Sequence, residues 1–334
     1  MVPHLRWNDR FSGCFADCAV RIGISLRCDL KRRPAAGQLC KRQTDGGNEL
    51  TIQRTIECRK HGSSQVQVAV LDASLQSSFS SAATVRKPDS LEDLAAQYGE
   101  RLWVAILDVT DSSAVRRVID HAFSELARID VVVSNAGYAL FGAAEEVGDA
   151  QIERQLDTNL LGSIQVARAA IPNLRRQGGG RIIQISSSVG QAAYPTMGVY
   201  AATKWGIEGF FEGTMPEIAP FGIEVTLVEP GASRTSFASS SADVAQALHV
   251  YDKTPAGEFR RMTATAGLAM FPGDPRKVAS AIIASADLQP APKRLTLGSD
   301  AYALVHKALT ERLTMLEAQK ELAHSTDVDG LRHG

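Results

Sequence analysis

Short apolar runs separated by amphipathic segments dominate the chain from Ala82 onward. Apolar runs without polar alternation are typical of strands covered on both faces, and they predict strands at 82–85, 102–107, 131–133, 181–185 and 223–228. Apolar residues at helical spacing predict helices at 91–98, 113–126, 150–176, 199–211, 275–286 and 301–322. This alternation predicts right-handed βαβ units, and hence an α/β fold with a doubly wound parallel sheet between two layers of helices.

Several local signals concern the ends of these elements. Ser90, followed by Asp93, predicts a capping box at the start of the helix 91–98. Pro216 lies where the helix after Tyr200 should still be running, so we expect it to kink or end that helix. Residues 236 to 271 are rich in Ser and Ala with little regular pattern, which predicts either a mobile lid or a plain surface loop.

The first 81 residues follow a different pattern. Residues 1 to 60 show neither helical nor strand periodicity, which predicts a disordered extension. They carry six more basic than acidic residues, whereas the rest of the chain carries seven more acidic than basic ones. Residues 61 to 81 contain the alternating run Gln65 to Leu71, which predicts a degenerate first strand. We therefore place the α/β domain at residues 82 to 300, and a C-terminal helix and tail at 301 to 334.

The composition is that of a soluble globular protein. Of 334 residues, 44% are hydrophobic and 22% charged, and no apolar run is long enough for a membrane span or a signal peptide, so a cytoplasmic enzyme with no membrane partner is expected. The basic N-terminal segment has little aromatic interleaving, which disfavours a nucleic-acid partner. It contains all five cysteines, without zinc-site spacing, so no metal is expected. They are Cys14, Cys18, Cys28, Cys40 and Cys58.

Polar and small residues gather where the predicted strands end. The residues that follow predicted strands are Arg86, Asp108, Asn135 to Gly137, Ser187, and Pro230 with Gly231. Because ligands of open α/β sheets bind beyond the carboxyl ends of the strands, we expect these residues to face one crevice.

Tyr200 and Lys204 carry the candidate chemistry. They lie four residues apart in a predicted helix, so both side chains project from one face. An ammonium beside a phenol is expected to pull the pKa of the phenol down from about 10, which makes a proton donor. Ser187, thirteen residues before Tyr200, ends a predicted strand, and its hydroxyl is placed to hold a carbonyl oxygen together with the phenol.

These motifs resemble those of the classical short-chain dehydrogenase/reductase family. The matching pieces, in the family's order, are LDVTD (107–111), SNAG (134–137), Asn159 within DTNLLG, ISSS (185–188), YAATK (200–204) and EPGASRT (229–235). The resemblance runs from about Ala82 to about Asp327. It implies a three-layer Rossmann-type fold and hydride transfer between a nicotinamide cofactor and an alcohol or carbonyl. The sequence around Tyr200 is most similar to that of the branch with 17β-hydroxysteroid and retinol dehydrogenase-like enzymes.

The resemblance implies four catalytic residues. Tyr200 would be the general acid in carbonyl reduction and the base in alcohol oxidation, and Lys204 would bind the nicotinamide ribose and depress the pKa of the phenol. Ser187 would orient the substrate oxygen, with Ser186 or Ser188 as the competing assignments. Asn159 would hold a water that links Lys204 to solvent, or would be an ordinary polar residue of a helix face.

The resemblance also implies the cofactor-binding residues. Besides Tyr200 and Lys204, they are Arg86, Asp108, Asn135, Ala136, Gly137, Pro230, Gly231 and Thr235. Asp108 would contact the adenine, or would instead cap the next helix. An Arg after the second strand accommodates a 2′-phosphate, so Arg86 and Lys87 favour NADP, with NAD possible.

The substrate is expected to be a small hydrophobic alcohol or carbonyl compound. This follows from apolar residues that either line a pocket or belong to the core, namely Tyr194, Met197, Phe237, Tyr251 and Phe259. The helix at 301–322 is expected to cover the pocket or to form the interface of a homo-oligomer.

One part of the family's pattern is missing. The first strand should be followed by TGxxxGxG, whose backbone amides receive the pyrophosphate, but Gly62 is the only glycine between Gly47 and Gly99. The first strand and glycine turn are therefore lost or altered, which favours an alternative function as an inactive or binding module that does not hold the cofactor.

A shift of reading frame would explain the missing turn. From His61 onward, triplets that start at the third base of each codon permit, with synonymous choices, the peptide WFITGASSGFGR. We hypothesise that residues 1 to about 81 are largely an out-of-frame translation and that the family's frame resumes near Ala82. Sequencing the gene tests this, because upstream codons that cannot supply those triplets would exclude it.

Overall fold

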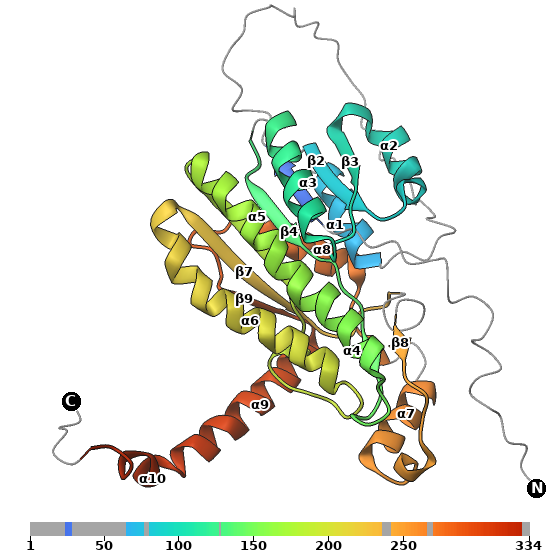
Figure 1. The fold of residues 1–334 in the computed structure, drawn as a ribbon, viewed down its shortest axis with the longest axis vertical. Helices are drawn as coiled ribbons and strands as arrows, with labels where there is room; N and C mark the ends of the chain where they lie inside the picture. Colours follow the sequence, from blue (N-terminus) through green and yellow to red (C-terminus); the bar gives the residue numbers. More distant parts are fainter. Residues whose placement is uncertain are drawn as a thin grey trace, which may run out of the picture.

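A computed structural model describes residues 24–28, 65–76, 80–126, 128–235, 242–265 and 270–328. These residues form strands that alternate with helices along the chain (Figure 1). The strands are β1 (Ile24–Cys28), β2 (Ser80–Val85), β3 (Leu102–Ile106), β4 (Val131–Ser134), β5 (Leu140–Phe141), β6 (Gly180–Ile185), β7 (Ile223–Pro230), β8 (Asp243–Val244) and β9 (Arg294–Leu297). The helices are α1 (Gln65–Gln76), α2 (Glu92–Tyr98), α3 (Ser112–Glu125), α4 (Asp149–Leu156), α5 (Gly162–Arg176), α6 (Gly198–Ile218), α7 (Pro255–Thr265), α8 (Pro275–Ser285), α9 (Ser299–Glu317) and α10 (Lys320–His324).

The main sheet has the strand order β3-β2-β1-β4-β6-β7-β9. Neighbouring strands are parallel from β4 to β9 and between β3 and β2. β1 is the exception, because it pairs antiparallel with both neighbours, with Ser25 opposite Ala83 of β2 and Val133 of β4. The carboxyl end of β1 therefore lies at the opposite edge of the sheet from the carboxyl ends of the other strands.

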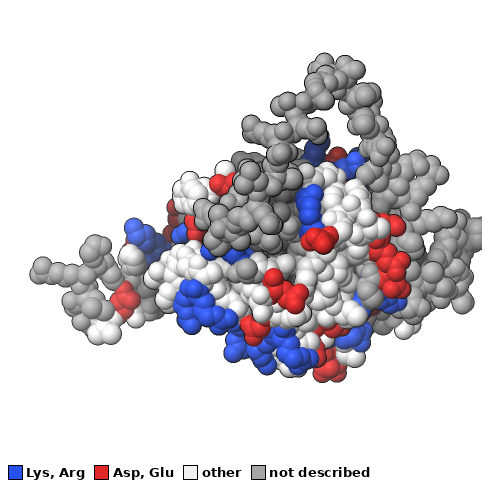
Figure 2. Space-filling model, turned by 90° about the horizontal axis from the view of Figure 1, so that it is seen from above, with Lys and Arg blue, Asp and Glu red and all other residues white. Residues whose placement is uncertain are grey.

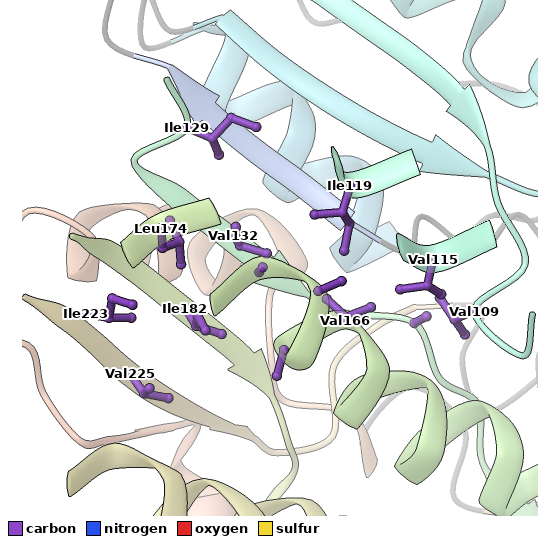
Figure 3. Close-up of a cluster of buried hydrophobic side chains, with 14 of the residues drawn as sticks. Val109, Val115, Ile119, Ile129, Val132, Val166, Leu174, Ile182, Ile223 and Val225 are labelled. Atoms are coloured by element: carbon purple, nitrogen blue, oxygen red, sulfur yellow. The ribbon is translucent and has the colours of Figure 1, made fainter. Parts of the chain in front are cut away.

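Apolar side chains fill both faces of this sheet. On one face, α3, α5 and α6 pack against β4, β6 and β7 through a core that includes Val132, Val166 and Ile182 (Figure 3). Phe211 of α6 belongs to the same core. On the other face, α1 and α8 pack against each other and against the strands. The sheet thus lies between two helical layers, and the doubly wound, three-layer α/β architecture expected from the sequence is confirmed.

The parallel strands β2, β3, β4, β6 and β7 agree with their sequence-based ranges to within two residues, but β9 was not predicted and other local predictions are wrong. Gln65 to Leu71 belongs to α1 instead of a strand. Ile24–Cys28 forms β1 within the segment expected to be disordered, and the rest of residues 1 to 60 lies outside the described residues, as do the cysteines other than Cys28. The segment 236 to 271, expected to have little regular structure, contains α7.

Two of the expected helix ends also differ. Ser90 does not cap α2, because its hydroxyl donates to Lys87 O within a 3-10 turn, Pro88–Leu91, that precedes the helix. Pro216 lies inside α6, which continues for two more residues to Ile218, so the proline acts close to the helix end.

The C-terminal helices extend away from the sheet (Figure 1). α9 touches the loop after β6 through Arg312, whose guanidinium donates to Gln191 O and lies 4.9 Å from the centre of the Trp205 ring. Leu309, Leu313 and Leu316 of α9 are exposed. A role of α9 in a homo-oligomer remains a prediction.

The surface carries charges of both signs. In the view of Figure 2, acidic and basic side chains are interspersed over the described part of this face. Among the described residues, no helix combines the length and apolar character that crossing a membrane requires.

Candidate active site

Helix α6 positions the candidate catalytic pair. Tyr200 and Lys204 lie one turn apart on its buried face, 4% and 5% exposed, and the Lys204 ammonium lies 5.8 Å from the centre of the Tyr200 ring. The ammonium donates to Ile185 O, the last carbonyl of β6, at 2.9 Å. One hydrogen bond therefore joins the helix to the carboxyl end of β6.

Ser187 follows that strand and faces the phenol. Its Oγ accepts a hydrogen bond from Val189 N at 3.2 Å, and a side-chain hydrogen bond joins it to Tyr200. Because a hydroxyl has a single proton, acceptance from Val189 leaves the O–H of Ser187 to point at the phenol or at a substrate oxygen. Of the three consecutive serines, Ser187 is the one hydrogen-bonded to Tyr200, and the Ser186 hydroxyl donates to Glu208 instead.

Burial sets the proton affinities of the pair. It raises the pKa of Tyr200 to about 12, and the hydrogen bond with Ser187 acts in the opposite direction. It lowers the pKa of Lys204 to about 8, and the attraction of Glu208 acts in the opposite direction. The expectation of a phenol with a depressed pKa is wrong for the chain alone, because desolvation of the phenolate outweighs the other influences on it.

Asn159 is fully buried in a π-helical turn, Asp157–Leu161, between α4 and α5. Its Oδ1 accepts from Tyr138 N at 3.0 Å and its Nδ2 donates to Tyr138 O at 2.9 Å. A side chain at Gly137 would approach Asn159 Oδ1 to 3.2 Å, so glycine allows this close packing. Asn159 therefore holds the segment after β4 in place, and its role in a water relay remains a prediction.

The residues expected at the adenosine end lie at strand ends. Arg86 and Lys87 are exposed after β2, and Asp108 is exposed after β3. Asp108 does not cap α3, because its carboxylate accepts from Thr110 N at 3.0 Å whereas Asp111 caps the helix. Asn135, Ala136 and Gly137 follow β4, with Ala136 and Gly137 buried.

Gly231 follows β7, where a residue missed in the sequence lies against it. Asp300, in the first turn of α9, accepts a hydrogen bond from Ala232 N at 2.7 Å. A side chain at Gly231 would come within 2.3 Å of the same carboxylate, so glycine is required. Pro230 ends β7, and Thr235 is the last residue described before the gap at 236–241. No local sequence pattern pointed to Asp300, because β9, the strand that precedes it, was not predicted.

Apolar residues surround Tyr200. Ala139, Val189, Met197, Ala201 and Ala242 form a buried cluster with the phenol, against which Phe141 and Phe259 pack. Phe259 comes from α7 and stacks on Tyr194 with ring centres 5.6 Å apart. Three of the expected pocket residues, Tyr194, Met197 and Phe259, therefore lie together.

Of the other two expected pocket residues, Tyr251 is not among the residues packed around Tyr200. Tyr251 forms a hydrogen bond with Glu145, which raises the pKa of its phenol, and Phe237 lies outside the described residues. A buried ion pair missed in the sequence holds α7 in place, since Arg260 donates to Glu146 at 2.6 Å.

Comparison with known proteins identifies the class. The short chain dehydrogenase family matches residues 67–245. The chain belongs to this family, and it is an oxidoreductase of the NAD(P)-dependent dehydrogenase/reductase type with a Rossmann-type fold.

Particular relatives extend the comparison. Oxidoreductase BOA17 of Botryotinia fuckeliana (strain B05.10) is 34% identical over 257 residues, which cover 77% of this chain and 93% of that protein. Human retinol dehydrogenase 8 is 36% identical over 152 residues, 45% of this chain and 48% of that protein. The crystal structure of a short-chain dehydrogenase from Streptomyces avermitilis has 32% identity and a TM-score of 0.73, and covers 79% of this chain and 96% of its own.

The residues fit the nicotinamide half of a dinucleotide better than the pyrophosphate half. Lys204 has three N–H groups, and Ile185 O is the acceptor that binds it among the described residues, so donors remain for ribose hydroxyls. The described residues contain no counterpart of the pyrophosphate turn: β1 ends at the far edge of the sheet, and the sequence between Gly47 and Gly99 holds a single glycine.

Proposed function

We propose that the protein interconverts a hydrophobic alcohol and its ketone or aldehyde, with Tyr200 as the acid and base. The observation that carries the proposal is the buried phenol between the hydroxyl of Ser187 and the ammonium of Lys204, directly beyond β6. The apolar cluster around the phenol supports a hydrophobic substrate, and the likeness to human retinol dehydrogenase 8 supports the same class.

Each residue has a distinct task in this mechanism. A bound nicotinamide cofactor supplies or accepts the hydride. The hydroxyls of Ser187 and Tyr200 hold the substrate oxygen, and Tyr200 delivers its proton to that oxygen during reduction or takes it back during oxidation. A pKa of about 12 keeps the phenol protonated at neutral pH, so the chain alone is prepared as a proton donor. Lys204 binds the ribose and places a positive charge beside the phenol.

NADP is the cofactor we propose, with NAD as the competing choice. Arg86 and Lys87 follow β2, where a guanidinium forms charge-assisted hydrogen bonds with a 2′-phosphate. Arg86→Asp should shift the preference from NADPH toward NADH, measured as the ratio of the two kcat/KM values. An unchanged ratio would contradict this assignment.

The decisive test follows NADPH oxidation by absorbance with cyclohexanone, acetophenone and a steroid ketone as substrates. Removal of the acid should lower turnover by roughly 10²–10⁴-fold in Tyr200→Phe. Tyr251→Phe is the matched control, because it loses a phenol that hydrogen-bonds to Glu145, and it should keep wild-type turnover. Equal rates in wild type and Tyr200→Phe would exclude the proposed mechanism.

A fold-retaining protein that does not hold the cofactor is the second candidate. The antiparallel β1 and the absent glycine turn favour it, because charge-assisted hydrogen bonds to the pyrophosphate, about 1.5–3 kcal/mol each, are then missing. Fluorescence titration with NADPH separates the two. Folded protein without affinity would support the second candidate, and saturable binding with Tyr200-dependent turnover would reject it.

A further inference from the structure

Three consecutive residues at the end of β6 contact three turns of α6. Ile185 O binds Lys204, the Ser187 hydroxyl binds Tyr200, and between them the Ser186 hydroxyl donates to Glu208 at 2.5 Å. Two of these contacts belong to the catalytic residues proposed above. The third ends on a carboxylate with no role in the proposed chemistry, although it lies one turn beyond Lys204.

Glu208 binds this segment at more than one point. Its other carboxylate oxygen accepts from Gln191 Nε2, so both ends of the segment Ser186–Gln191 are tied to one side chain. A side chain at Gly190 would come within 2.0 Å of Glu208 Oε1, so glycine leaves room for the carboxylate. Glu208 is 2% exposed, which makes these hydrogen bonds stronger than surface ones.

A partly exposed cation, Arg294, supports this carboxylate. Arg294 of β9 donates through Nη1 to Glu208 at 2.5 Å and to Glu229 of β7, and through Nη2 to Glu212 at 2.5 Å. Glu208 therefore faces Lys204 and Glu212 on its own helix, Glu229 on β7 and Arg294 on β9. Burial of a carboxylate requires such a partner, because the desolvation penalty is otherwise large.

We propose that Glu208 is a positioning residue that fixes the segment Ser186–Gln191 against α6, with Arg294 as its counter-ion. Through its hydrogen bonds to Ser186 and Gln191, Glu208 fixes the position of the Ser187 hydroxyl. Through its negative charge, it favours the protonated form of Lys204. Glu208 itself does not touch the substrate. The inference rests on the proposed oxidoreductase function for its catalytic consequence, but not for its effect on Lys204.

The experiment compares Glu208→Gln, Ser186→Ala and Glu212→Gln. Glu212 is the matched control. It lies one turn further along α6 and contacts the same Arg294, but it is exposed and does not bind the segment Ser186–Gln191. NADPH-dependent reduction of whichever test ketone the wild type reduces fastest should fall by roughly 10–100-fold in kcat for the first two variants, since small misplacements of catalytic groups have effects of this size. Glu212→Gln should stay within about twofold.

A titration of Lys204 distinguishes the effect of the Glu208 charge from its effect on the position of Ser187. The protonation of Lys204 is followed by NMR titration of lysine-labelled protein, with Lys204 assigned from Lys204→Met. The pKa of Lys204 should fall in Glu208→Gln, because a neighbouring negative charge is lost, and it should stay in Ser186→Ala, which keeps the charge. The alkaline limb of the profile of activity against pH should likewise move to lower pH in Glu208→Gln and stay in place in Ser186→Ala.

The outcomes discriminate between the inference and the proposed function. Wild-type kcat in both Glu208→Gln and Ser186→Ala would overturn the positioning role, as would an equal loss in Glu212→Gln. If the wild type reduces no ketone, the proposed function fails, and the Lys204 titration alone decides the inference: an unmoved pKa in Glu208→Gln overturns it. If Glu208→Gln does not fold by circular dichroism, Ser186→Ala decides through kcat.

Discussion

Replacement of Lys204 by Met should change how the stability of the protein depends on pH. The pKa of Lys204 is about 8 in the folded chain and 10.5 ordinarily, so between these values the unfolded chain binds a proton that the folded chain does not. The contribution of Lys204 to the free energy of unfolding therefore rises with pH in this window, by at most about 1.4 kcal/mol per unit. At lower pH both states hold the proton, and the wild type carries the full cost of a buried ammonium.

These two pKa values imply that, between pH 7 and pH 9.5, the free energy of unfolding of the wild type rises by about 2 kcal/mol relative to that of Lys204→Met. Met has a similar length and no charge, so the difference between the two proteins cancels the titration of all other groups. Urea unfolding at both pH values measures it. A difference between wild type and variant that does not change with pH, or that changes in the opposite direction, would refute the reasoning.

Three further predictions concern packing. Gly209→Ala should raise the free energy of unfolding by about 1 kcal/mol in thermal or urea unfolding, because a side chain there meets nothing within 4 Å and alanine favours the helix; a lower melting temperature would count against it. Phe211→Ala should destabilise the fold by about 3–5 kcal/mol, since the ring is fully buried between α6 and the sheet, and a loss below 1 kcal/mol in the same assay would contradict this packing. Phe259→Ala should raise KM for hydrophobic ketones by about tenfold with little change in stability, whereas an unchanged KM would place the ring outside the substrate path.

The strands β4, β6 and β7 were predictable because they are buried on both faces along most of their length, whereas β9, which is only half-buried, was not predicted. Strands buried on both faces are continuous apolar runs, and the runs before Asn135, Ser186 and Gly231 mark β4, β6 and β7 closely. The right-handed alternation of strands and helices then leaves few possible topologies. The positions of Tyr200, Lys204 and Ser187 follow from helix period and strand end alone, and the structure brings these three together.

The remainder depended on tertiary contacts that no local pattern contains. Gln65 to Leu71 alternates like a strand, but Leu71 and Leu75 are fully buried one helical turn apart, and that spacing extends beyond the alternating run. Glu208 and Arg294 are 86 residues apart in sequence, so their pairing is visible only in the folded chain. The direction of the pKa shift of Tyr200 required its burial to be known, because composition cannot weigh desolvation against a neighbouring charge.

The direction of β1 separates two properties that a strand usually contributes together. Its backbone completes the hydrogen-bond ladder between β2 and β4 although it runs antiparallel to both, so the sheet is continuous without a parallel strand at this position. The orientation of β1 does decide whether the turn that follows it lies at the edge of the sheet where the other strands have their carboxyl ends. Continuity of the sheet and recognition of a coenzyme are thus separate properties in this fold. The strands β2, β3, β4, β6 and β7 still end at one edge of the sheet, so a parallel strand followed by its own turn can be engineered between β2 and β4.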